Sequence, residues 1–540
     1  MEILKLLEDR CGYQKKRIGS LNWSRDSSAY ELELAKILQE QDRYEKERKA
    51  LQCHLKDGNR RILGLQARYA MLSNRKCSIL QLPEEITRTI FFCTQEYPNE
   101  SKLYWLGESG PLPEVVISHV CRQWRSISLA YPFLWTRFGH DAGQSNHVPL
   151  DRFEAYLSRS RSKPLELWFD FHVDDHEEID LEELLALLEM AISHVHRWKY
   201  VYVMSDEDFP LWTVSGMLEW ASVPWLEYFA FCNNYDSKYP PSLQPAIFKK
   251  GAPNLKSVIL DTSIGQKLLP PLQNITTLCF ECQDTSEVVD QPFPWPTFVV
   301  VLSLPFLVNL SIMGKIFEEP ALLDLADPIT MKNLENLRFG DTGSSFPSIL
   351  PFLKAPLLQT LFIKNDSLEA LGNSQSEPQG FPSLELLVLF ETSFNTQAAR
   401  YLANMTQSVT NITILKKEDD ASLFSVFLHS HGEYWPNLKF VHLDIDIGLR
   451  LKEVIQCIQA RRDSALILQI SDDVLNQWQS TNTPFLGLPY TLGELEKICC
   501  IKTVNSKYIS VPAVWIEHWP TLQWCPDFIL KRKSNVAHQF

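Results

Sequence analysis

The histidines and carboxylates of residues 172–178 come nearest to a metal site in this sequence. The segment reads His-Val-Asp-Asp-His-Glu-Glu, and imidazole and carboxylate groups are both common zinc ligands. The same acidic residues directly precede an apolar stretch, 181–191, that has helical spacing. Carboxylates at that position would stabilise the amino-terminal end of a helix through its dipole. We prefer this second interpretation and predict no metal site.

Cysteine and histidine pairs elsewhere give no stronger signal. Cys279 and Cys282 have the spacing of a zinc-binding pair, but no second pair accompanies them and they lie in a predicted strand. His194 and His196 are expected to end a helix, and nothing near Cys121 suggests a lowered thiol pKa. The glycine-rich nucleotide motifs and the Gly-x-Ser-x-Gly nucleophile motif are missing. We therefore expect a protein without catalytic residues, metal or cofactor.

Composition limits the class of partner. The chain has 540 residues, with 52 Lys and Arg against 66 Asp and Glu, so its net charge is −14. Such a balance argues against a nucleic-acid partner, which would need a basic stripe. The first ten residues lack the pattern of a signal peptide. The apolar stretch 298–313 is short for a membrane span and contains Pro305, so we expect it to lie in the core. We expect no membrane partner and a cytoplasmic or nuclear location.

Residues 30–72 carry a heptad pattern. Two seam positions hold mostly large apolar residues, with polar exceptions at Gln41 and Arg48. The first position holds Tyr30, Ile37, Tyr44, Leu51, Gly58, Leu65 and Leu72, and the second holds Leu34, Gln41, Arg48, Leu55, Ile62 and Tyr69. One interpretation is a long helix packed on the next domain, and the other is a coiled coil through which two copies associate. The polar exceptions favour the first, and the sequence 57–59 (Asp-Gly-Asn) is a turn signal that could divide the helix.

A repeat begins after residue 160. The template apolar-x-x-apolar-x-apolar recurs at intervals of 20 to 32 residues, close to the period of leucine-rich repeats. The matches begin at Trp198, Leu226, Leu255, Ile275, Leu307, Leu334, Leu358, Leu384, Val409 and Leu438. Segments between them, such as 318–326 and 396–405, are predicted helices. This pattern predicts a solenoid of strand–turn–helix units with a parallel sheet, in preference to an ordinary α/β domain.

A second periodic feature supports the repeat. In a leucine-rich repeat, the residue three positions after the last apolar residue of the strand forms hydrogen bonds with the backbone of the following turn. Eight of the ten residues at that position can accept a hydrogen bond, and the two lysines cannot. These residues are Asp206, Asn234, Ser263, Gln283, Lys315, Thr342, Asp366, Thr392, Lys417 and Asp446.

Residues 79–140 contain an ordered set of short motifs. They are Leu82-Pro83-Glu84-Glu85-Ile86, then Ile90-Phe91, then Val120-Cys121-Arg122-Gln123-Trp124-Arg125, and finally Pro132-Phe133-Leu134-Trp135. In this order they resemble an F-box. Together with the upstream heptads and the segment 150–165, the chain resembles a group of fungal F-box proteins abundant in mushroom-forming species.

The resemblance implies a non-catalytic adaptor. F-box proteins bind a Skp-type adaptor and, through it, a cullin–RING ubiquitin ligase, while the rest of the chain holds a protein substrate. The residues carried over to the adaptor face are Leu82, Pro83, Ile86, Ile90, Phe91, Val120, Cys121, Trp124 and Trp135. The long segment 95–113 departs from a short F-box and leaves adaptor binding open. The alternative function is a repeat scaffold that acts outside ubiquitin transfer.

The substrate would bind the concave face of the repeats. Residues between the strand apolar positions point there, and exposed aromatic side chains are typical of binding hot spots. These residues are Tyr200, Tyr202, Tyr228, Phe362, Phe440 and His442. Equally, loops or the F-box end could cover them. The net negative charge weakly indicates a basic partner surface.

The expected fold class is α/β, with an N-terminal helical segment and a small all-α F-box followed by a leucine-rich-repeat-like solenoid. The order of residues 1–29 is left open by the sequence. The remaining segments are the long helix at 30–78, the F-box at 79–140, a connector with a first irregular repeat at 141–197, the repeat domain at 198–525 and a tail at 526–540.

Overall fold

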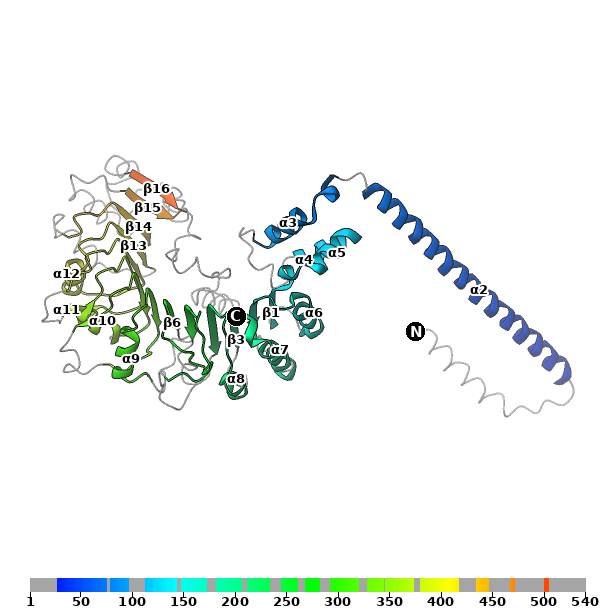
Figure 1. Ribbon diagram of the computed structural model, residues 1–540, viewed down its shortest axis with the longest axis horizontal. Coiled ribbons are helices and arrows are strands. Elements are labelled where there is room, and N and C mark those ends of the chain that lie inside the picture. The colour runs from blue at the N-terminus through cyan, green and yellow to red at the C-terminus, as the bar shows by residue number, and fades with distance from the viewer. Residues whose placement is uncertain are drawn as a thin grey trace. The chain divides into compact units, whose positions relative to one another are not determined.

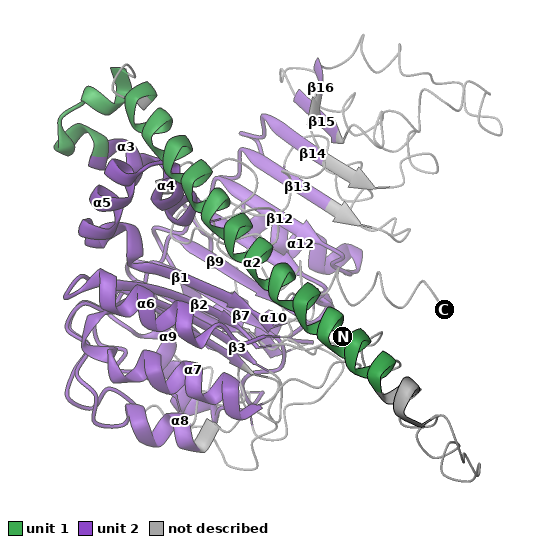
Figure 2. Cartoon of the chain, turned by 90° about the vertical axis from the view of Figure 1, so that its right-hand side faces the viewer, with its two compact units in different colours: residues 1–87 green, residues 88–540 purple. Residues whose placement is uncertain are grey.

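The structure of the chain is a computed structural model (Figure 1). It describes residues 27–74, 78–96, 112–142, 147–171, 181–205, 211–233, 244–260, 268–281, 292–319, 328–343, 345–372, 379–416, 434–445, 467–471 and 500–504. The chain divides into two compact units, residues 1–87 and 88–540 (Figure 2). The boundary falls inside a helix of the predicted 79–140 domain.

The first unit is dominated by one helix of 48 residues, α2 (Ser27–Asn74). The turn signal at 57–59 does not divide it, because Gly58 lies within the continuous helix. The short helix η2 (Ser78–Gln81) follows, and then α3 (Glu84–Glu96) begins. Pro83 directly precedes α3, and Glu84 and Glu85 occupy its first turn, where the helix dipole favours negative charge.

The second unit starts with a small helical bundle. Its members are the rest of α3, α4 (Pro113–Val120), α5 (Arg122–Ala130) and η4 (Pro132–Trp135). Pro113 starts α4 at a position where its missing N–H costs nothing. Cys121 is extended between α4 and α5, and its Sγ accepts a hydrogen bond from the backbone N–H of Trp124, so this thiol caps α5.

The bundle has an aromatic core. The rings of Phe91 and Trp124 meet edge to face with centroids 5.0 Å apart. The Trp135 indole is buried, and its Nε1 donates a hydrogen bond of 2.8 Å to the carbonyl of Ser128. This bond satisfies a polar group that would otherwise be costly to bury.

A parallel sheet forms the body of the second unit, and within the described residues it has fourteen strands in chain order (Figure 1). Its strands are β1 (Arg137–Asp141), β2 (Leu165–Asp170), β3 (Trp198–Ser205), β4 (Tyr228–Asn233), β5 (Ser257–Leu260), β6 (Thr277–Glu281), β7 (Asn309–Met313), β9 (Asn336–Gly340), β11 (Thr360–Lys364), β12 (Leu386–Phe390), β13 (Asn411–Lys416), β14 (Phe440–Ile445), β15 (Ile467–Ser471) and β16 (Cys500–Val504). Strands β8 (Ile329–Thr330) and β10 (Leu353–Lys354) pair separately. The mixed α/β class with a large parallel sheet is therefore confirmed.

Helices connect the strands and lie along one side of the sheet (Figure 1). They are α6 (Leu150–Ser160), α7 (Leu181–Ser193), α8 (Leu211–Leu218), α9 (Trp295–Leu302), α10 (Ser345–Ile349), α11 (Glu369–Gly372) and α12 (Thr396–Met405), with the short η6 (Val195–Arg197) and η8 (Leu350–Phe352). The predicted helices at 181–191 and 396–405 are present as α7 and α12. Glu318 and Glu319, the described start of the segment 318–326, are not helical, so that prediction is wrong at its start.

The apolar positions of the repeat template form the core beneath the sheet. Each of the ten residues that begin a template match is at most 2% exposed. Alternate strand residues point to opposite faces, so one face carries this core and the other carries the intervening residues.

Polar side chains also join successive turns before the strands. Asn333 Nδ2 donates to the carbonyl of Pro305 at 2.7 Å, and Ser383 Oγ donates to that of Pro356 at 2.8 Å. Asn254 makes the same bond to Pro224. Each bond links one strand–turn unit to the unit before it, a device that the sequence analysis did not anticipate.

The predicted row of hydrogen-bonding residues after the strands is present in part. Thr342, Asp366 and Thr392 are buried, and the Thr342 hydroxyl donates to Asp366 Oδ2 at 2.7 Å. Lys315 is exposed, which fits its inability to accept a hydrogen bond. The predicted positions Asp206, Asn234, Ser263, Gln283, Lys417 and Asp446 lie outside the described residues.

Candidate functional site

Four large apolar side chains of the helical bundle reach solvent in the second unit. Ile90 is 37% exposed, Val116 41%, Val120 55% and Phe133 39%. They come from α3, α4 and η4, which are short helices packed around a small aromatic core. Four large apolar residues exposed on so small a bundle are candidates for contact with a protein partner.

The residues predicted to bind an adaptor divide into two groups by burial. Pro83, Ile86, Ile90 and Val120 are exposed and free to contact a partner. Leu82, Cys121 and Trp124 are half-buried, and Cys121 also caps α5. Phe91 and Trp135 are 1% exposed and belong to the core, so they support the surface without forming it.

Val116 and Phe133 are exposed apolar residues that the motif-based prediction missed. Val116 lies four residues before Val120 on α4, and this spacing places both on one face of the helix. Phe133 stands in the Pro-Phe-Leu-Trp motif, where Leu134 and Trp135 are buried and Phe133 is not. The helical spacing could have identified Val116 from sequence alone.

Helix α6 ties the bundle to the sheet. The Tyr156 hydroxyl donates a hydrogen bond to Glu114 Oε1 in the first turn of α4, and both side chains are buried. The Trp135 and Tyr156 rings meet edge to face with centroids 5.2 Å apart, and the Arg159 guanidinium lies 4.4 Å from the Trp135 ring centroid. Burial raises the pKa of Tyr156 well above its usual value, and the neighbouring carboxylate of Glu114 raises it further.

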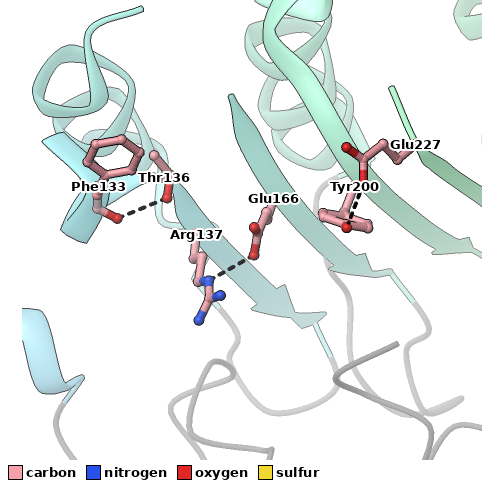
Figure 3. A network of polar contacts seen from close by, with 6 residues as sticks. All are labelled: Phe133, Thr136, Arg137, Glu166, Tyr200 and Glu227. Atoms are coloured by element: carbon pink, nitrogen blue, oxygen red, sulfur yellow. Dashed lines mark hydrogen bonds and ion pairs between the residues drawn. The ribbon is translucent and has the colours of Figure 1, made fainter. Parts of the chain in front are cut away.

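A series of polar contacts continues from the bundle into the first strands (Figure 3). The Thr136 hydroxyl donates to the carbonyl of Phe133 at 2.9 Å, and Arg137 Nε forms an ion pair with Glu166 Oε2 at 2.8 Å. On β3, the Tyr200 hydroxyl donates to Glu227 Oε2 at 2.9 Å. Burial and the Glu227 carboxylate raise the pKa of Tyr200, so it remains a hydrogen-bond donor at neutral pH.

The face of the sheet opposite the described helices carries a second aromatic cluster, at the end of the sheet where β1 begins. The Trp168 and Tyr202 rings are stacked, with centroids 5.8 Å apart and planes 2° from parallel. Tyr228 joins this cluster, and Tyr200 packs against it. The cluster links β2, β3 and β4 on the face opposite the helices.

Most of the predicted substrate-binding residues are buried in this structure. Tyr202 and Tyr228 are each 5% exposed, Phe362 is 1% exposed and His442 6%, while Tyr200 and Phe440 are half-buried. The burial favours the alternative in which these side chains are covered. Their role in substrate binding stays a prediction.

Two buried cations occupy the middle of the same face, and the sequence analysis did not single them out. The Arg338 guanidinium lies 5.3 Å from the ring centroid of Phe362, and Lys364 Nζ lies 5.9 Å from that of Phe390. Each pair is also in register between neighbouring strands, β9 with β11 and β11 with β12. Attraction between a cation and an aromatic ring offsets part of the cost of burying the charge.

Only part of the candidates for metal chemistry lies among the described residues. In the part of the chain that the structure describes, no three His, Cys, Asp or Glu side chains come together as a metal site. Cys279 is buried in β6, as predicted for a small core residue, and Cys282 and residues 172–178 lie outside the described residues. His194 and His196 stand at the end of α7 and in η6, as expected for helix-end residues.

None of the described helices has the length and apolar character needed to cross a membrane.

Comparison of the chain with models of known protein families gives no match, and comparison with curated proteins gives none either.

Proposed function

We propose that the protein is a substrate-recognition subunit of a Skp–cullin–F-box ubiquitin ligase. In this proposal, the bundle formed by α3, α4, α5 and η4 is an F-box, and the sheet with its connecting helices is a leucine-rich-repeat-like solenoid. The bundle would bind the Skp-type adaptor and the solenoid a protein substrate, without catalytic groups of the chain's own. Such a complex would act in the cytoplasm or nucleus.

The observation that carries the proposal is the exposure of apolar residues within the F-box-like motifs. Ile90 and Val120 occupy motif positions, and both remain exposed although the bundle has a well-packed core of its own. Exposed isoleucine and valine contribute little to the stability of the bundle, because they leave apolar surface in water. A partner that covers them explains the motif better than stability of the bundle does.

The tie between bundle and sheet suits this role. Tyr156 and Glu114 bond α6 to α4, and Arg137 and Glu166 join the first two strands. A ligase adaptor must hold its substrate at a defined place relative to the ubiquitin-transfer machinery. Close packing between the bundle and the first strands supplies this fixed geometry.

The test is binding of the full chain to a purified Skp-type adaptor. We expect the parent protein to bind and the Ile90→Asp/Val120→Asp variant to lose binding, since two charges would be placed in an apolar interface. Val300→Asp is the matched control, because Val300 is 56% exposed on α9 in the repeat region. A well-folded parent that does not bind the adaptor would overturn the proposal.

The alternative is a scaffold whose repeats bind a partner without transferring ubiquitin to it. A reconstituted ligase containing the chain and a partner captured by the repeats separates the two. Ubiquitin on the captured partner supports the ligase proposal, and binding without ubiquitin transfer supports the scaffold.

A further inference from the structure

Helix α2 exposes its large apolar residues from Leu32 to Leu72. At 1.5 Å per residue, its 48 residues span about 72 Å. Ile37 is 58% exposed, Leu51 63% and Leu65 68%, and the other large apolar side chains of the helix are similarly open. A helix gains most of its stability by packing an apolar face, so a helix with this surface calls for a partner.

The apolar residues recur with a heptad period, which identifies the kind of partner. Writing the heptad as abcdefg, the a positions are Leu34, Gln41, Arg48, Leu55, Ile62 and Tyr69, and the described d positions are Ile37, Tyr44, Leu51, Gly58, Leu65 and Leu72. A seam of this kind is completed by a second helix of the same pattern. Another copy of α2 offers that pattern over the same length.

Charges beside the seam decide between parallel and antiparallel pairing. The g positions change character along the helix: they are acidic at Glu33, Glu40 and Glu47, and His54, Arg61 and Arg68 follow, of which the two arginines are positively charged. In a parallel dimer each g residue faces an e residue of the second copy five positions on. Glu40 would then face Glu45, and no g residue would face an opposite charge.

In an antiparallel dimer, g positions lie opposite g positions of the second copy. One register places each acidic g residue opposite an arginine or histidine. The facing pairs are Glu33 with Arg68, Glu40 with Arg61, and Glu47 with His54, each formed twice by symmetry. The same register aligns Leu34 with Leu65 and Ile62 with Ile37 in the seam. Gln41 then faces Gly58, where the missing side chain leaves room for the longer amide.

We propose that α2 forms an antiparallel coiled coil with α2 of a second copy of this chain. Within one helix, Arg61 Nε lies 3.1 Å from Asp57 Oδ2, but both side chains are exposed and such a pair contributes little. Arg61 can therefore turn to Glu40 of the second copy at small cost. The dimer places the two carboxyl-terminal ends of α2 about 70 Å apart, so that the rest of each chain extends from an opposite end.

The test is the mass of the full chain, measured by sedimentation velocity over a range of concentrations, for the parent and two charge-reversed variants. The first variant is Glu33→Arg/Glu40→Arg, and the second is Arg61→Glu/Arg68→Glu. In either variant alone the facing charges repel, so we expect dimerisation roughly tenfold to hundredfold weaker than in the parent. When the two variants are mixed, opposite charges face each other again, and we expect heterodimers as stable as the parent dimer.

The control is Lys36→Glu/Lys56→Glu, which reverses two charges at positions away from the seam and its flanks. It should dimerise like the parent, and circular dichroism should show equal helix content in all variants. A parent that is monomeric at every concentration overturns the proposal. A dimer strengthened by Glu33→Arg/Glu40→Arg, or variants that fail to restore each other, overturns the antiparallel register.

These outcomes are independent of the proposed ligase function. The substitutions lie on α2, outside the residues expected to meet the Skp-type adaptor. A chain that dimerises but does not bind the adaptor overturns only the ligase proposal. A monomer that binds the adaptor overturns only the coiled-coil proposal.

Discussion

Tyr156 donates a hydrogen bond to the carboxylate of Glu114, 42 residues earlier in the chain, with both side chains buried. Glu114 lies in the first turn of α4, where the helix dipole also favours a negative charge. Tyr156 lies on α6, whose other buried residues pack into the core under the sheet. One bond therefore joins the helical bundle to the element that packs beneath the parallel sheet.

Replacing this tyrosine tests how much the joint contributes to stability. Tyr156→Phe removes the hydroxyl and leaves the Glu114 carboxylate buried without that donor, so we expect a loss of about 1–3 kcal/mol in the free energy of unfolding. Urea unfolding of the full chain measures it. Glu114→Gln is the control, because its amide oxygen still accepts from Tyr156, and it should cost less. Equal stability of Tyr156→Phe and the parent would contradict this account.

Asp366 makes stability depend on pH between about 4 and 7. Burial raises the pKa of Asp366 to about 7, although hydrogen bonds from Thr342 and Gly343 oppose the shift. The folded state holds the Asp366 proton more tightly than the unfolded state does. The contribution of Asp366 to the free energy of unfolding is therefore fully present below about pH 4 and is lost as the pH rises through about 7. We expect Asp366→Asn to remove this loss and to be more stable than the parent above that pH.

Urea unfolding at a series of pH values checks this prediction. The amide can keep the contact, since the Thr342 hydroxyl can rotate to accept a hydrogen bond from it. The same acid-to-amide change at exposed Glu385 is the control. A parallel pH dependence for the parent and Asp366→Asn would show that Asp366 does not carry the effect.

His140 should act in the opposite direction. Burial and, to a smaller extent, the nearby positive charge of Arg152 together lower the pKa of this β1 imidazole to about 4. Its stabilising contribution is therefore complete above about pH 6.5 and is lost as the pH falls toward 4.

Replacing His140 should separate it from Asp366. Between pH 4 and 6.5 the two groups oppose each other, so the parent can show a shallow slope that hides both. We expect His140→Leu to make the chain lose stability as the pH rises across this range, and unfolding of the two single variants and the double variant measures each contribution. An unchanged slope in His140→Leu would reject this assignment.

The sequence predicted the strand pattern well because side-chain alternation is a local property. The starts of the ten template matches are all buried, and Thr342, Asp366 and Thr392 form part of the predicted polar row. Alternation also predicted which residues share the face opposite the described helices. It could not predict that Tyr202 and Phe362 would be buried there, because burial depends on what covers a face.

The candidate adaptor face was predicted less completely for a related reason. A sequence motif records residues needed for both folding and contact, so Phe91 and Trp135 were grouped with Ile90 and Val120. Only packing separates the core residues from the exposed ones. The hydrogen bond between Tyr156 and Glu114 could not be predicted from the sequence either, because no local pattern relates residues so far apart in the chain.

Gly340 should be a site where even one methyl group disturbs the sheet. A Cβ on this β9 residue would lie 2.6 Å from the carbonyl oxygen of Lys364 and 2.9 Å from Met313 Cε. The backbone of β11 cannot yield cheaply, so we expect Gly340→Ala to lower the free energy of unfolding by about 1–3 kcal/mol. Gly216→Ala in α8 is the matched control, because a Cβ there meets nothing within 4 Å, and alanine should stabilise the helix by up to about 1 kcal/mol. Urea unfolding of the two variants should give opposite signs, and a Gly340→Ala chain as stable as the parent would mean that β9 and β11 are not as close as the structure has them.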